Sequence, residues 1–191
     1  MIKLIIAVTL VVTGCFFGSI IDFSEQDIKG KENVIFNSSF EEGEFAADPI
    51  PLGWIILNDM QSCVSSDLEN FNSVQRSLLI SHPHKKINLV SESFPLDPDG
   101  IYFSRCFLKT NYQSNQAVEI LFVAFDSKGK QVNKYKTKAY PQENWTKVVM
   151  TASFFKPNAR FGRIIISFPA RPDKVFWLDD VESYNMYNIQ K

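Results

Sequence analysis

The residue types that most often perform catalysis are sparse in this chain. Its two histidines, His82 and His84, flank Pro83 without other obvious metal ligands nearby, a pattern typical of a surface turn or strand end. The sequence contains no Gly-x-Ser-x-Gly elbow, phosphate-binding loop or zinc signature. Carboxylates are plentiful, but nothing singles out a pair for glycoside hydrolysis. We therefore expect no enzymatic activity.

Cys15 has the most informative context of the three cysteines. A lysine, an apolar run from Leu4 to Val12 and small residues precede it, which predicts a secretory signal over residues 1–14. The stretch Val12-Thr13-Gly14-Cys15 resembles the lipobox of bacterial lipoproteins, and this resemblance implies cleavage before Cys15 and lipidation of that residue. The implied location is the bacterial cell envelope, lipid-anchored and facing outside the cytoplasm. Two alternatives stay open: an ordinary signal cut slightly later, and a retained membrane helix, because residues 4–21 carry no charge.

The other two cysteines, Cys63 and Cys106, could pair in an exported protein or remain separate thiols. With a formal net charge of −1, the chain lacks the concentrated basic surface that phosphate binding requires, so we expect no nucleic-acid partner. Hydrophobic residues make up 45% of the chain, enough to bury the core of one domain.

Short apolar or alternating runs recur from residue 33 onward, separated by turn signals such as PLDPDG, DSKG and PARPD. The runs are NVIFN, WIILNDM, SLLIS, INLVSESF, IYFSRCFLK, AVEILFVAF, QVNKYKT, WTKVVMTASF, RIIISF and KVFWLDDVESY. This pattern predicts an all-β fold, a jelly-roll β-sandwich of about ten antiparallel strands. Residues 15–32 are more polar and show no period, so we expect a lipid-anchored tether there and the folded domain over 33–191.

The order of these motifs resembles carbohydrate-binding modules of families 4, 9 and 22, which have a galactose-binding-domain-like jelly roll. NVIFNSSFEEG followed by PLGW is similar to their opening, and SLLI is similar to their Ser-Leu strand. PLDPDGIYFSRCFLKT, VAFDSKGK, ENWTKV and VFWLDDVESY resemble later segments in the same order. The resemblance covers residues 33 to 184 and implies a non-catalytic module that binds a poly- or oligosaccharide.

The resemblance also implies a structural calcium that joins the two ends of the domain. Glu41 and either Asp179 or Asp180 match the carboxylates that hold this ion, and hard Ca²⁺ ions prefer such oxygen ligands. Neighbouring residues on a strand point to opposite faces, so only one aspartate should face the metal, and we favour Asp179. Alternatively, Glu41 belongs to a solvated acidic loop.

Strand parity suggests where a ligand would bind. One face of IYFSRCFLK carries Phe103, Arg105 and Phe107, and Glu119 lies opposite the apolar face of AVEILFVAF. With Tyr135, these residues form the predicted ligand face, since aromatic rings pack against sugar C–H groups and polar side chains bond to hydroxyls. Cross-strand ion pairs on a solvated sheet would account for the same charges. The three tryptophans are expected to be packing residues.

The sequence thus predicts a membrane-tethered glycan-binding domain. A surface lipoprotein that serves adhesion or assembly by contacting protein partners, with no sugar ligand, is the alternative, because fold does not determine function.

Overall fold

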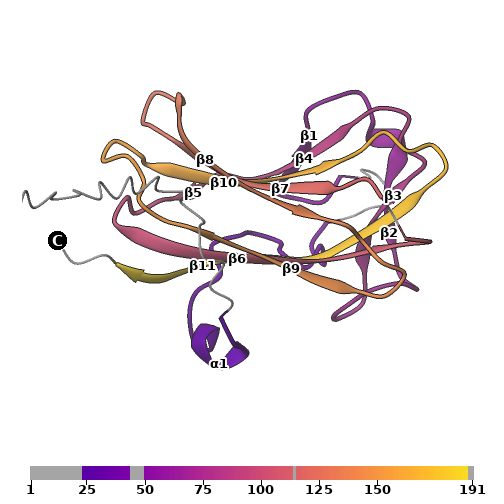
Figure 1. Cartoon of the computed structure of the whole chain (residues 1–191), viewed down its shortest axis with the longest axis horizontal. Helices are drawn as coiled ribbons and strands as arrows, with labels where there is room; N and C mark the ends of the chain where they lie inside the picture. Colours follow the sequence, from indigo (N-terminus) through magenta and orange to yellow (C-terminus); the bar gives the residue numbers. More distant parts are fainter. Residues whose placement is uncertain (1–22, 44–49, 114, 189–191) are drawn as a thin grey trace, which may run out of the picture.

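The computed structural model describes residues 23–43, 50–113 and 115–188; the predicted signal segment and Cys15 lie outside them. Two antiparallel sheets pack face to face as the layers of a β-sandwich (Figure 1). The predicted all-β jelly roll is confirmed, with eleven strands in the residues described. None of the helices in the described part of the chain has the length and apolar character of a membrane span.

The six-stranded sheet has the order β1-β4-β10-β7-β8, and β5 pairs with β10. Its strands are β1 (Trp54–Ile56), β4 (Ile87–Ser91), β5 (Phe94–Pro95), β7 (Val118–Phe125), β8 (Gln131–Ala139) and β10 (Phe161–Phe168). The five-stranded sheet has the order β2-β3-β11-β6-β9. Its strands are β2 (Val64–Asp67), β3 (Ser77–Ser81), β6 (Gly100–Thr110), β9 (Thr146–Ala152) and β11 (Val175–Asn188). A 3-10 turn, η1 (Gln61–Cys63), precedes β2.

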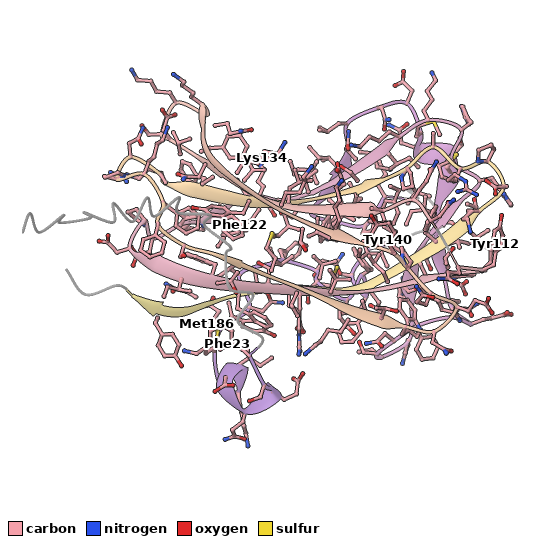
Figure 2. All side chains as sticks on the ribbon, viewed as in Figure 1. Phe23, Tyr112, Phe122, Lys134, Tyr140 and Met186 are labelled. Atoms are coloured by element: carbon pink, nitrogen blue, oxygen red, sulfur yellow. The ribbon has the colours of Figure 1, made fainter. Side chains whose placement is uncertain are left out.

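The core fills the space between the two sheets, where alternate residues of each strand meet. Phe122 of β7 lies there, as Figure 2 shows, within an aromatic cluster whose ring centroids are 5.3 to 6.4 Å apart. A Cβ atom on Gly162 would come within 2.4 Å of the Phe94 ring, so this close approach requires glycine. The predicted packing role of Trp54 is confirmed, since this residue is buried in the core.

The run NVIFN is not a strand, unlike the other predicted runs, each of which contains one. Asn33 forms a single bridge to Tyr184, and the chain then turns, with Asn37 at φ 48°. The Asn37 side chain stabilises this turn: it accepts a hydrogen bond from the Glu42 N–H and donates to the Glu42 and Leu52 carbonyls. Local amide hydrogen bonds of this kind compete with strand pairing.

A short helix, α1 (Glu25–Ile28), lies against the outer side of the five-stranded sheet (Figure 1). Phe23, which precedes the helix, and Ile28 pack with Phe103, Tyr184 and Met186 in a second apolar cluster. Figure 2 shows Phe23 beside Met186 on this side of the sandwich and Lys134 on the opposite side. Residues 23–32, predicted to be part of a tether, are therefore packed on the folded domain.

Candidate functional site

The outer face of the six-stranded sheet carries an apolar row across its central strands, in which Val90 and Leu121 are buried and Ile165 is half-buried. In β10, Ile164 and Ile166 point into the core, so Arg163 and Ile165 point outward. Ile165 is paired with Val90 of β4 on one side and with Leu121 of β7 on the other. Strand pairing therefore places aliphatic side chains in a continuous row across this face.

Two hollows open on this face, and both are bordered by Arg163. The first is lined chiefly by Leu57, Val90, Phe125, Phe161 and Ile165. The second is lined chiefly by Phe36, Leu52, Gly53, Ile55 and Glu92. Their rims are apolar and accessible, with exposed fractions from 42% for Phe161 to 60% for Leu57. Contiguous exposed apolar surface of this kind is typical of a binding site.

Arg163 is half-buried between the two hollows. Its side chain makes no hydrogen bond or ion pair with the residues that the structure describes. A guanidinium group carries five N–H donors, which a bound ligand with oxygen acceptors could satisfy. The combination of apolar hollows and an unpaired polar group fits recognition of a ligand with both characters.

Lysines border this face on the edge strand β8, where Lys134, Lys136 and Lys138 are all exposed. Glu119 of β7 lies between Lys136 and Lys86, with Nζ–Oε distances of 3.1 and 3.2 Å. Hydrogen bonds from Lys136 and Lys86 lower the pKa of the Glu119 carboxyl. Glu119 thus takes part in a cross-strand ion-pair network, the alternative that the sequence left open for its charge.

The five predicted ligand residues do not share one face. Phe103, Arg105 and Phe107 lie on β6 in the five-stranded sheet, whereas Glu119 lies on β7 in the other sheet. Tyr135 of β8 turns its ring inward against Phe122 and Phe155, and its hydroxyl donates to the Ser153 carbonyl. The expectation of a common surface is wrong because β6 and β7, although consecutive, join different sheets.

The predicted β6 face is also covered by the N-terminal segment. Phe103 is fully buried beneath Phe23, with ring centroids 5.1 Å apart. Arg105 forms ion pairs with Glu25 of α1 and Glu182 of β11. Its charge is thus neutralised within the chain. Phe107, further along β6, is half-buried on the same side of the sheet.

Lys31 extends the docking of the N-terminal segment beyond α1. Its ammonium group donates to the Met186 carbonyl at 2.9 Å and lies over the Tyr187 ring, 5.3 Å from the centroid. Together with the apolar contacts of Phe23, these interactions make the segment part of the domain and cover this face around Phe103 and Met186.

The three predicted calcium ligands instead hold the loop between β2 and β3. Asp179 Oδ2 accepts hydrogen bonds from the backbone N–H groups of Asn72 and Ser73, at 2.8 and 3.2 Å. Asp180 accepts from the side chains of the same two residues, at 2.7 and 2.6 Å. Both aspartates reach one loop because Asp180 adopts φ 47° at an irregularity in β11, which breaks the alternation expected of a strand.

Glu41 holds the end of the same loop. Its Oε1 accepts hydrogen bonds from the Gln75 and Arg76 N–H groups at 3.1 and 3.0 Å, and Oε2 lies 3.5 Å from the Arg76 guanidinium. Among the described residues, no group of three or more His, Cys, Asp or Glu side chains is arranged to bind a metal ion. These carboxylates therefore do not fit the predicted calcium site, because loop donors occupy the oxygens that a cation would need.

Asp179 is fully buried, and burial, followed by repulsion from the Asp180 carboxylate, raises its pKa from 3.8 to about 7. The three N–H groups that it bonds oppose this effect only in part. The free energy needed to desolvate the Asp179 carboxylate exceeds the stabilisation that these hydrogen bonds give. The protonated form is therefore populated near neutral pH.

Cys63 and Cys106 are free and buried, which settles the pairing question. Burial raises the pKa of the Cys106 thiol to about 12, so this group is protonated at neutral pH.

Arg163 and Phe161 are the site residues that sequence reasoning missed. The signal was present in FGRIIISF, where an arginine occupies an alternate position in an otherwise apolar central strand. This residue stands out only when the strand is known to be flanked on both sides, as β10 is.

No family model and no curated protein matches this sequence, but its fold matches many solved structures. A family 16 carbohydrate-binding module is 16% identical, with a TM-score of 0.59 over 79% of this chain and 99% of its own. A xylan-binding family 22 module from Paenibacillus barcinonensis is 14% identical, with a TM-score of 0.56 over 81% of this chain and 94% of its own. An arabinose-bound α-L-arabinofuranosidase is 12% identical, with a TM-score of 0.60, but this chain, matched over 80% of its length, spans only 26% of that enzyme.

Carbohydrate-binding modules dominate the structures that match over nearly their full length. The chain thus has the jelly-roll β-sandwich of these modules, as its motifs predicted. At identities this low, the structural matches establish only the fold, and the function must be argued from the site.

Proposed function

We propose that this chain is a non-catalytic glycan-binding domain whose site is the outer face of the six-stranded sheet. The observation that carries the proposal is the pair of accessible hollows on either side of Arg163. Sugars present apolar C–H faces and polar hydroxyls, and this surface offers Phe161 and Phe125 for the former and a guanidinium for the latter.

The fold supports this proposal, since domains of similar architecture include one named as xylan-binding and one solved with β-1,4-galactotriose. The lipobox-like sequence before Cys15 supports display at the bacterial cell envelope through a lipid anchor. Because α1 docks on the five-stranded sheet, the chain enters the domain on the side opposite the proposed site (Figure 1).

The aliphatic character of the hollows favours a second candidate, a protein partner bound in an adhesion or assembly role. Leu52, Ile55 and Leu57 are all exposed on this face, and aliphatic side chains stack on sugars less specifically than aromatic rings. This candidate uses the same surface and predicts no saccharide binding.

Calorimetric titration of the full chain with a panel of soluble glycans tests the proposal. Replacing the exposed ring of Phe161 by Ala should weaken binding about threefold to tenfold, the usual contribution of one aromatic contact. Phe154→Ala is the matched control, because Phe154 is 80% exposed and lines neither hollow. A folded domain that binds no glycan, or an equal loss in both variants, would contradict the proposal.

A further inference from the structure

Arg163 indicates the charge of the ligand, which the apolar hollows around it do not indicate. It lies on β10, paired with Val123 of β7 on one side and placed on the other side where β4 gives way to β5, and its guanidinium has no partner among the described residues. A guanidinium without an internal partner keeps its five N–H donors available to a ligand. Lysines on an exposed edge strand discourage edge-to-edge pairing, but that explanation does not apply to a central strand.

The charges around Arg163 are mostly positive. Strand pairing places Val123 next to Arg163 and Lys134 next to Val123, so both cationic side chains lie on the same line across the sheet. Glu119 is neutralised by its two lysine partners. Glu92, which lines the second hollow, is the remaining carboxylate there, and it makes no ion pair with the described residues.

This face therefore carries excess positive charge, although the whole chain has a formal net charge of −1. Among the described groups that line the two hollows or lie on β8, the four cations Arg163, Lys134, Lys136 and Lys138 outnumber the single carboxylate Glu92. A surface with a local excess of positive charge favours negatively charged ligands, whatever the net charge of the whole chain.

We propose that the ligand is an acidic polysaccharide, and that Arg163 binds a carboxylate or sulfate group on one of its internal sugars. This inference rests on the proposed glycan-binding function. A planar guanidinium binds a carboxylate or sulfate through two parallel N–H···O bonds, which gives geometric specificity as well as affinity. The hollows flank Arg163 on both sides, so sugar rings before and after the charged unit each meet apolar surface.

The test titrates the full chain with polygalacturonate, which carries carboxylates, with dextran sulfate, and with neutral β-1,4-galactan. Polygalacturonate or dextran sulfate should bind more tightly than galactan, and the stronger of the two identifies the anionic group. Arg163→Met should weaken that binding about tenfold to a hundredfold, because charge-assisted hydrogen bonds are lost while the aliphatic stem is kept. Arg163→Lys should recover only part of the affinity, and Glu92→Gln should tighten binding.

Lys29→Met is the matched control, since Lys29 is exposed beside α1 on the opposite side of the sandwich and this change also removes one positive charge. Circular dichroism of each variant establishes that it is folded. Equal losses in Arg163→Met and Lys29→Met would show non-specific attraction and overturn the inference. Binding of galactan that Phe161→Ala weakens, without preference for the acidic polymers, would overturn the inference but not the proposed function. Absence of binding to all three polymers would contradict both.

Discussion

The buried carboxyl group of Asp179 should make the stability of this domain depend on pH in the neutral range. Burial and the neighbouring Asp180 carboxylate raise its pKa from 3.8 to about 7 in the folded chain. A tenfold change in an acid dissociation constant corresponds to about 1.4 kcal/mol, so the raised pKa corresponds to about 4 kcal/mol. That figure is an upper value, because the loop around Asp179 can relax and admit water as the carboxyl ionises.

The sign follows from proton binding. Between the unfolded and folded pKa values, the folded chain holds a proton on Asp179 that the unfolded chain has released. The free energy of unfolding from this group is therefore highest below about pH 4 and falls as the pH rises through about 7. Ionisation of Asp179 at higher pH places a buried charge next to the Asp180 carboxylate, and the hydrogen bonds from the Asn72–Ser73 loop offset this cost only in part.

Urea unfolding followed by tryptophan fluorescence, at a series of pH values from about 4 to about 8, measures this dependence. The Asp179→Asn variant cannot titrate at this position, so its free energy of unfolding should vary less with pH over the same range. Glu143→Gln, which removes an exposed carboxyl group, should retain the full dependence. If Asp179→Asn and the unmodified chain give parallel curves, Asp179 does not titrate in this range and the reasoning is refuted.

Two further predictions concern the ends of the domain. Addition of EDTA or of calcium should leave Tm unchanged, because loop N–H and hydroxyl groups already bond to the carboxylate oxygens of Glu41, Asp179 and Asp180. A clear rise of Tm with calcium would contradict this prediction. Phe23→Ala should lower the free energy of unfolding by about 3 kcal/mol, because it removes the buried ring that packs on Phe103. The exposed control Phe154→Ala should change the free energy of unfolding little. Equal effects of these two substitutions in urea unfolding would show that the N-terminal segment is not docked.

Much of the fold could be predicted because strand alternation is a local property. The inward positions of β6, including Tyr102, Cys106 and Leu108, are buried as their parity predicted. The apolar face of β7, which includes Phe122, likewise lies in the core. Each of these assignments depends only on which residues alternate within one short segment.

The candidate site could not be predicted in the same way. Parity shows that Arg105 and Glu119 both point away from the core, but it does not show that their strands belong to opposite sheets. It also gives no sign that Glu25, far away in sequence, neutralises Arg105. Arg163 and Arg105 look alike in sequence, as single arginines on the outward face of an apolar strand.

The sequence by itself determined the all-β class, most of the strand segments and the core-facing positions of strands such as β6 and β7, because each follows from spacing along a few neighbouring residues. Tertiary structure decided which sheet each strand joins, which outer face α1 covers and which stays accessible, and that Glu41, Asp179 and Asp180 hold a loop. These outcomes depend on contacts between residues far apart in the chain, such as Asp179 with Asn72. Local periodicity does not predict such contacts, since many sheet orders bury the same strand faces equally well.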